Sequence, residues 1–133
     1  MKNTIFTGMA TAIVTPMTRD GIDYEALGRF LEFQIENGIN AIVVMGTTGE
    51  NATIEYADQK EIIRFTVEKV AGRVPVIAGT GTNNTEHVLH NTRISPERAF
   101  ISLIFSSAVL QKTEIRYPRK RTLVWNFCAV RLS

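Results

Sequence analysis

Short apolar runs alternate with amphipathic stretches over the first two thirds of the chain. Three runs, Met9–Pro16, Ala41–Met45 and Val74–Ala78, are rich in β-branched residues, which is typical of buried strands. Between them, apolar residues recur every three or four positions over residues 24–37 and again over residues 55–70. This spacing predicts two helices with one apolar face each. The strand-helix-strand-helix-strand order predicts a parallel sheet with helices on at least one face.

Polar residues and glycines mark the ends of these elements. Thr18–Gly21 reads as a turn, and Asp23 is placed to cap the helix that follows. Asn37 and Gly38 are expected to end that helix, and Gly72 to end the second one. The same signals predict a cap for a third helix at residues 83–86.

The second apolar run stops abruptly at Gly46-Thr47-Thr48-Gly49-Glu50. We expect the two glycines to permit a positive φ or a close approach to a ligand. The threonines offer hydroxyl and N–H groups to a small carboxylate or phosphate. Because α/β proteins place ligands at the carboxyl ends of parallel strands, this turn is the candidate site. The alternative is that the threonines only satisfy turn backbone groups.

Two further groups near this rim have a functional and a structural interpretation. Glu50 could act as a general base, but we favour a carboxylate that caps the second helix. Gly79-Thr80-Gly81 could cradle a phosphate, but we favour a plain turn after the third strand. Thr15 and Pro16 end the first strand, so all three strand ends are expected at one rim.

Three segments together resemble a known family. They are ATAIVTPM at residues 10–17, ENGINAIVVMGTTGEN at residues 36–51 and VPVIAGTGTNNTE at residues 74–86. In this order and spacing they resemble the 4-hydroxy-tetrahydrodipicolinate synthase (dihydrodipicolinate synthase) family, which is one of the pyruvate-dependent class I aldolases. The resemblance covers residues 1 to about 87. It implies an α/β fold, the first three β-α units of a (β/α)8 TIM barrel.

The resemblance also implies a reaction. In this family a lysine amine forms a Schiff base with pyruvate, and the enamine adds to aspartate semialdehyde in the diaminopimelate route of lysine biosynthesis. By match to the motif, Thr48 would hold the pyruvate carboxylate, Thr47 would belong to a proton relay, and Gly46 and Gly49 would shape the substrate turn. The lyase would need no cofactor and no metal, would be cytoplasmic, and in full-length relatives is a homotetramer. The form GTTGE favours the synthase over N-acetylneuraminate lyase, the alternative within the group.

The chain departs from the family after its third strand. Neither the tyrosine-bearing TPYYN motif nor a lysine at a strand end can be recognised among Lys2, Lys60, Lys69, Lys112 and Lys120. A TIM barrel needs about 250 residues, and this chain has 133. We therefore expect a truncated or frame-shifted synthase that is inactive by itself. The alternative is a non-catalytic βαβαβ fragment that acts as an interaction module.

Composition changes sharply near residue 88. Residues 1–87 hold 7 Lys and Arg against 11 Asp and Glu, whereas residues 88–133 hold 8 against 2 and have no glycine. We therefore divide the chain into a partial TIM barrel at residues 1–87 and an irregular basic tail at residues 88–133. Within the tail, short strands or a helix at residues 99–110 both stay open. With three strands the far edge of the third lacks a partner, so we expect self-association or aggregation.

Other partner classes receive little support. The basic cluster at residues 116–121 could bind nucleic acid or acidic lipid, but a short basic run needs no partner, and we expect no nucleic acid. His87 and His90 have a spacing that can bind a metal, yet Cys128 is remote and no third ligand is evident. A single cysteine gives no internal disulfide, and no apolar run approaches the length of a membrane span.

Overall fold

The described residues form one parallel sheet, two α-helices and a small hairpin. The structure is a computed structural model that describes residues 6–81, 100–104 and 122–125. In chain order the elements, of which η1 and η2 are single 3₁₀ turns, are β1 (Ala10–Ala12), β2 (Met17–Thr18), β3 (Gly21–Ile22), α1 (Tyr24–Glu36), β4 (Ala41–Val44), η1 (Thr47–Gly49), η2 (Asn51–Thr53), α2 (Tyr56–Val70), β5 (Val76–Gly79), β6 (Phe100–Ile104) and β7 (Thr122–Trp125).

The sheet is parallel throughout, with the strand order β1-β4-β5-β6-β7. Sequential strands joined through helices, as β1-α1-β4 and β4-α2-β5, are the pattern that the apolar runs predict. The described sheet contains two strands, β6 and β7, in addition to the three that the apolar runs predict. Both β6 and β7 lie in the part predicted to be an irregular tail, and β6 pairs with the far edge of β5. The expectation that the third strand lacks a partner on that edge is therefore wrong.

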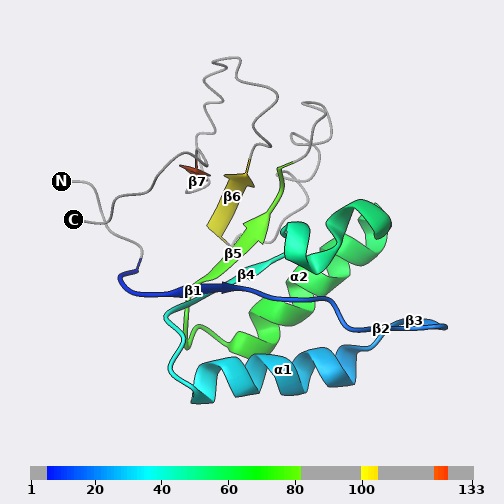
Figure 1. Ribbon diagram of the computed structural model, residues 1–133, viewed down its shortest axis with the longest axis horizontal. Helices are drawn as coiled ribbons and strands as arrows, with labels where there is room; N and C mark the ends of the chain where they lie inside the picture. Colours follow the sequence, from blue (N-terminus) through cyan, green and yellow to red (C-terminus); the bar gives the residue numbers. More distant parts are fainter. Residues whose placement is uncertain (1–5, 82–99, 105–121, 126–133) are drawn as a thin grey trace.

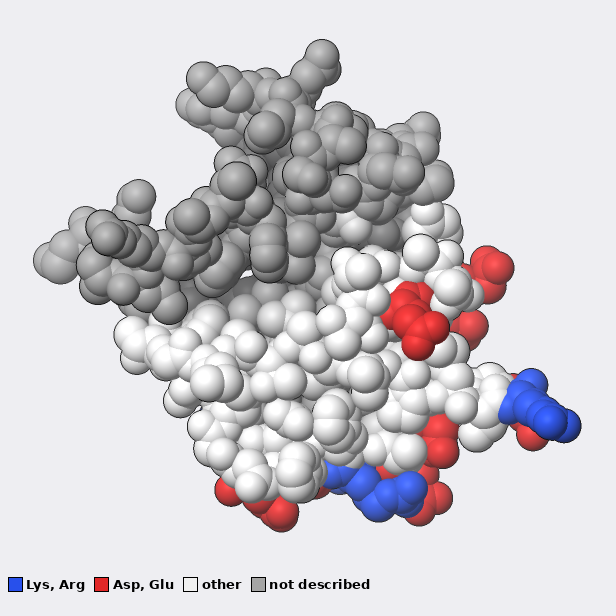
Figure 2. All heavy atoms as spheres, viewed as in Figure 1, with Lys and Arg blue, Asp and Glu red and all other residues white. Residues whose placement is uncertain are grey.

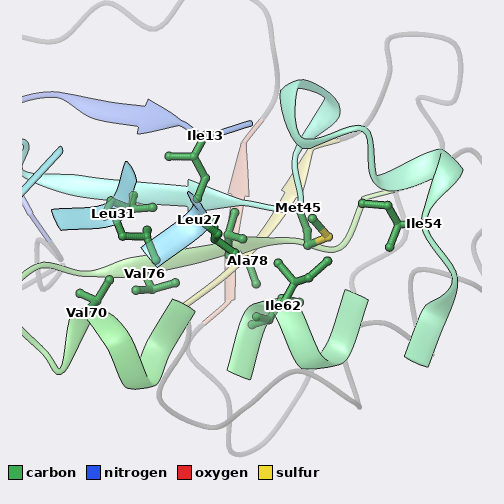
Figure 3. Packing of buried hydrophobic residues seen from close by; sticks show 12 residues of the cluster. Ile13, Leu27, Leu31, Met45, Ile54, Ile62, Val70, Val76 and Ala78 are labelled. Atoms are coloured by element: carbon green, nitrogen blue, oxygen red, sulfur yellow. The ribbon is translucent and has the colours of Figure 1, made fainter. Parts of the chain in front are cut away.

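Both helices lie on the same side of the sheet (Figure 1). Alternate strand residues, such as Ile42 and Val44 on β4, pack against the helices in one apolar core. Figure 3 shows Met45, Ile54 and Ile62 at one end of this core and other members at the opposite end. The buried cluster consists of Ile13, Leu27, Leu31, Ile42, Val44, Met45, Ile54, Ile62, Ile63, Val70, Val76 and Ala78.

The residues that alternate with this core are also apolar. Ala41 and Ile77 are buried but are not members of the cluster, and Val43 is half-buried. Val14, beyond the end of β1, is 48% exposed. Parallel strands with apolar residues on both faces are typical of sheets that are covered on both sides. This pattern is the one expected of strands from a barrel.

The predicted helix ends are confirmed. The Asp23 carboxylate accepts a hydrogen bond of 2.8 Å from the backbone N–H of Ala26 at the start of α1. After α1, Gly38 has a φ of 81°, and after α2, Gly72 has a φ of 75°. The predicted turn at residues 18–21 is the tip of the β2–β3 hairpin.

Two strands differ from their predicted bounds. The first was expected over Met9–Pro16, but β1 ends at Ala12, although the Ile13 N–H still donates to the Val43 carbonyl at 3.0 Å. The third was expected from Val74, but β5 starts at Val76. Proline lacks an N–H for the ladder, so Pro16 and Pro75 shorten the paired segments.

An ion-pair cluster joins α1 to the end of α2. The Arg73 guanidinium donates two hydrogen bonds to the Glu32 carboxylate, at 2.7 and 2.9 Å, and the Lys69 ammonium lies 3.4 Å from the same group. The hydrogen bond from Arg73 is the main reason that the pKa of Glu32 falls from 4.5 to about 2.

Candidate carboxylate-binding site

The ends of β1, β4 and β5 meet at one rim of the sheet. The Thr15 hydroxyl, just after β1, donates a buried hydrogen bond of 2.8 Å to the Gly49 carbonyl in the turn after β4. On the other side, a Cβ placed on Gly79 of β5 would lie only 2.4 Å from the Met45 carbonyl oxygen. The backbone of this turn is therefore held between its two neighbouring strands.

Positive φ angles occur beside the expected glycines and not on them. Met45 has a φ of 58° and Glu50 a φ of 55°, whereas Gly46 has a φ of −79° and Gly49 is not in the left-handed region. Of the two roles expected for these glycines, a positive φ or a close approach to a ligand, the positive φ is therefore not adopted by either one. A left-handed conformation costs a non-glycine residue about 1–2 kcal/mol. Burial of the Met45 side chain in the core offsets this backbone strain, because the side chain is fully buried.

Gly49 is required for space. A Cβ on Gly49 would lie 3.2 Å from the Thr15 hydroxyl oxygen and 3.3 Å from the Ile13 carbonyl oxygen. Both separations are tighter than ordinary van der Waals contact, so a larger residue would push the turn away from β1. Gly46 has no comparable neighbour, since the nearest atom to its Cβ position is 3.7 Å away.

Thr47 and Thr48 form the exposed part of the turn. Both lie in η1, a 3₁₀ turn closed by hydrogen bonds of 3.0 Å from Gly49 N–H to the Gly46 carbonyl and from Glu50 N–H to the Thr47 carbonyl. Both threonines are exposed, and neither hydroxyl has a hydrogen-bond partner among residues 6–81. The turn thus presents two hydroxyl groups on a fixed backbone, which is the arrangement needed to bind a small oxyanion.

Glu50 does not cap the second helix. Its side chain makes no capping hydrogen bond to η2, and the residue at the N-cap of α2 is Glu55. The expectation of a capping carboxylate at Glu50 is therefore wrong. The left-handed backbone at Glu50 separates η1 from η2, and five residues lie between Glu50 and the start of α2 at Tyr56. The Glu50 carbonyl instead accepts a hydrogen bond of 2.9 Å from the Thr53 hydroxyl.

Gln59 supports the rim from α2 and was not predicted. Its side-chain amide is buried and donates to the Asn51 carbonyl at 2.8 Å and the Ile54 carbonyl at 2.7 Å. These bonds hold the segment that leads from η2 into the helix. A signal was present in the sequence, because Gln59 precedes Ile62, Ile63 and Thr66 at helical spacing and so falls on the buried stripe of the helix.

The described part of the rim carries no cation. Residues 13–16, 44–54 and 79–81 contain no Lys or Arg, and Glu50 is their only charged residue. Figure 2 shows the same contrast, because charged side chains gather over α1, α2 and the β2–β3 hairpin, and the described surface over β1 is uncharged. The groups that residues 13–16, 44–54 and 79–81 offer to a carboxylate are therefore hydroxyl and N–H groups.

The lysines among the described residues lie on α2 and not at the rim formed by the strand ends. Lys60 and Lys69 are exposed on α2, and Lys69 pairs with Glu32 on α1. Lys2, Lys112 and Lys120 lie outside the described residues.

The third Gly-rich turn has a packing role at its first residue. Gly79 belongs to β5, and the space that its side chain would need is occupied by the Met45 and Gly46 backbone. Thr80 is buried beside it. This contact explains Gly79 by packing against the neighbouring turn, and the interpretation of residues 79–81 as a plain turn stays a prediction.

The remaining candidate groups of the sequence cannot be placed. His87, His90, Cys128, the cap at residues 83–86 and the basic cluster at residues 116–121 lie outside the described residues. Within the described residues, no group of three His, Cys, Asp or Glu is arranged to hold a metal ion. No helix in that part is long and apolar enough to cross a membrane.

Comparison with known proteins identifies relatives of one kind. The sequence model of the dihydrodipicolinate synthetase family matches residues 5–103. The 4-hydroxy-tetrahydrodipicolinate synthase of Acetivibrio thermocellus is 43% identical over 113 residues, which cover 85% of this chain and 39% of that protein. The enzyme of Kosmotoga olearia is 51% identical over 83 residues, which cover 62% of this chain and 28% of that protein.

Solved structures agree with the sequence comparison. The structure of the chloride-inhibited dihydrodipicolinate synthase from Acinetobacter baumannii, complexed with pyruvate, matches with a TM-score of 0.66 at 35% identity. The match covers 75% of this chain and 36% of that one. Because such neighbours are TIM-barrel proteins, the described sheet and helices correspond to part of a TIM barrel.

The matches cover most of this chain but less than half of each relative named above. The chain spans about two fifths of the length of the curated relatives it matches, 39% for Acetivibrio thermocellus. The family match continues past residue 87, where the composition changes, to residue 103 within β6.

Proposed function

The chain belongs to the dihydrodipicolinate synthetase family, and from this premise we propose that Thr47 and Thr48 form the pyruvate-binding turn of a Schiff-base lyase. In the proposed reaction pyruvate condenses with aspartate semialdehyde to 4-hydroxy-tetrahydrodipicolinate, a step of lysine biosynthesis in the cytoplasm. The observation that carries the proposal is the exposed hydroxyl pair on a backbone fixed between β1 and β5.

Each threonine has its own role in the proposal. Thr48 binds the pyruvate carboxylate through its hydroxyl and N–H, and Thr47 passes a proton during Schiff-base chemistry. Hydroxyl groups suit both tasks, because they donate and accept without adding a charge beside a cationic iminium. Gly46 and Gly49 complete the turn, with Gly49 giving the close contact to Thr15. A relative of this chain has been solved with pyruvate bound.

The proposal separates binding from turnover. A Schiff base needs a lysine amine at the site, and Lys60 and Lys69 are exposed on α2. No TPYYN segment occurs in the chain. We therefore propose that this chain binds the keto acid at its rim but does not by itself convert aspartate semialdehyde.

The binding step can be tested by titrating the ¹⁵N-labelled chain with pyruvate and following amide shifts by NMR. We expect the largest shifts at residues 46–50. Thr48→Val, which keeps the shape but removes the hydroxyl, should weaken binding about tenfold, the cost of one charge-assisted hydrogen bond. Thr18→Val in the β2–β3 hairpin makes the same exchange away from the rim and should leave the affinity unchanged.

Two further ligand conditions sharpen this test. Methyl pyruvate keeps the ketone but has no carboxylate, so we expect it not to shift the turn residues. Wild-type chain that shows no shift with pyruvate, or equal losses in Thr48→Val and Thr18→Val, would refute the carboxylate site. Borohydride treatment with pyruvate tests turnover separately. A covalent adduct on a lysine of this chain would contradict the proposed inactivity.

A further inference from the structure

We propose that Thr15 is a positioning residue for the keto-acid turn, acting through the Gly49 carbonyl. The inference rests on the proposed function, because it concerns the turn that carries Thr47 and Thr48. Thr15 does not itself face the ligand in this proposal. It fixes the backbone on which the two ligand-binding hydroxyls stand.

The contact has the properties of a positioning bond. Thr15 is only 6% exposed, and its hydroxyl donates at 2.8 Å to a carbonyl that is 34 positions away in the chain. Gly49 is buried as well. A buried carbonyl that loses its donor is costly, since water does not replace the bond. Removal of the Thr15 hydroxyl would therefore favour other conformations of the turn.

The two ends of the turn are fixed by different strands. At the first end, Gly79 lies so close that its missing Cβ would overlap the Met45 carbonyl. At the second end, the Gly49 N–H donates to the Gly46 carbonyl at 3.0 Å, and the Gly49 carbonyl accepts from Thr15. Thr47 and Thr48 lie between these anchors, and their side chains have no hydrogen-bond partner among residues 6–81. Among residues 6–81, the backbone that carries these two side chains is thus held by the two anchors and by the hydrogen bonds within η1.

The chain offers a matched control for a merely structural role. Thr66 on α2 is fully buried, and its hydroxyl donates at 2.8 Å to the Ile62 carbonyl. Thr66→Val deletes a buried hydroxyl-to-carbonyl bond of the same length as Thr15→Val does. Only Thr15→Val removes a bond to the ligand-binding turn. Thr15→Ser keeps that hydroxyl and should behave like the wild type.

The test measures pyruvate affinity by NMR titration, together with amide hydrogen exchange at residues 47–50, for the full chain and these three variants. We expect Thr15→Val to raise the pyruvate Kd about tenfold, because the binding-competent fraction of the turn falls to about a tenth. Amide exchange in the turn should speed up at least as much, because the open fraction rises from a small value to about nine tenths. Thr66→Val should lower the thermal midpoint but leave both quantities unchanged, and Thr15→Ser should restore them.

The outcomes separate this inference from the proposed function. If the wild type does not bind pyruvate, the proposed function fails, and the exchange rates of the turn still decide whether Thr15 positions it. If Thr15→Val and Thr66→Val alter exchange at residues 47–50 equally, or if Thr15→Ser behaves like Thr15→Val, the positioning role is refuted. Unchanged exchange and affinity in Thr15→Val would refute it as well.

Discussion

Met45 shows how a single residue serves both the core and the rim. Its backbone is left-handed at a φ of 58°, while its side chain is fully buried. Burial of a methionine side chain contributes about 1.5–3 kcal/mol, which is enough to offset the cost of about 1–2 kcal/mol for its backbone. The carbonyl of the same residue lies against Gly79. The start of the turn after β4 is therefore fixed by packing on two sides.

Gly79→Ala tests the backbone contact. The new Cβ would lie 2.4 Å from the Met45 carbonyl oxygen, so the strands must separate. We expect the free energy of unfolding to fall by about 3 kcal/mol, as in strongly overpacked cores. Gly46→Ala is the control, because its nearest neighbour is at 3.7 Å and its φ is −79°. It should change stability by less than about 1 kcal/mol. Urea unfolding measures both, and equal effects would contradict the contact.

The sequence points to the two exposed threonines of the rim turn more clearly than to the residues that hold this turn in place. Thr47 and Thr48 stand out because hydroxyls and glycines follow an apolar strand directly. The hydrogen bonds of Thr15 and Gln59 cannot be read from the sequence, because backbone carbonyls accept them, in one case 34 positions away. Helical spacing indicates only that Gln59 falls on the buried face of α2. The positive φ angles fall on Met45 and Glu50, beside the glycines that could have adopted them, for a related reason. A glycine permits that conformation, whereas tertiary packing decides which residue adopts it.

At the scale of elements, the end of α2 contains a strained backbone position. The helix ends with Ala71 in the left-handed conformation at a φ of 52°, followed by Gly72 at 75°. Glycine is the residue usually found at the first of these positions. Gly72 correctly indicated where the helix ends. The strained left-handed conformation, however, is adopted by Ala71, the residue before it.

Ala71→Gly is expected to stabilise the protein. The substitution relieves about 1–2 kcal/mol of left-handed strain and costs about 0.5–1 kcal/mol of added chain entropy, so we expect a net gain near 0.5–1 kcal/mol. Ala57→Gly, at an exposed position inside the same helix, should instead cost about 1 kcal/mol. Thermal unfolding monitored by circular dichroism measures whether each of the two substitutions stabilises or destabilises the protein. A destabilised Ala71→Gly variant would contradict the argument.

The ion pairs between α1 and Arg73 predict a pH dependence. The pKa of Glu32 is about 2 in the folded chain, below its ordinary value of 4.5. Because the folded pKa is the lower one, the stabilisation is fully present above about pH 5 and is lost as the pH falls towards about 2. Glu32→Gln should therefore be less stable than the wild type near neutral pH and equally stable near pH 2. Urea unfolding across this range measures the difference.

Glu36→Gln provides the comparison for this pH test. Glu36 lies one turn further along α1 and forms none of the ion pairs among the described residues. We expect its substitution to leave the acid limb of the stability curve unchanged. A similar loss in both variants would assign the effect to general charge rather than to the pair with Arg73.

The amphipathic helices were predictable at this scale, and the later strands were not. Residues 24–37 show a repeat of three to four, and a capping aspartate fixes the start. By contrast, β6 and β7 lie in a region without glycine, where no turn signal separates a strand from a helix. Their assignment depends on pairing with β5 and with each other, which is tertiary information.

At the scale of the whole molecule, the sheet has two outer strands. Within the described residues, β1 pairs only with β4 and β7 pairs only with β6. Close to β1, Met9 is 70% exposed and Val14 is 48% exposed. Outer strands with apolar surroundings invite pairing with another chain. The division of the chain into a partial barrel at residues 1–87 and a tail at residues 88–133 stays a prediction.

We therefore predict that the chain self-associates. Size-exclusion chromatography with light scattering should give a mass that rises with concentration. Ala12→Lys places a charge on the exposed side of β1 and should shift the population towards monomer. Ala57→Lys adds the same charge on α2 and should not. A wild-type chain that is monomeric at every concentration would contradict this prediction.

The dual position of Met45 has a consequence for engineering. A protein designer who wished to accept bulkier keto acids would first randomise the exposed threonines and leave the interior untouched. In this chain the loop and the interior share a residue, and Met45, Ile54 and Ile62 lie together at one end of the core (Figure 3). Libraries that vary these three interior positions alongside the threonines would sample new loop shapes that surface changes alone leave out of reach.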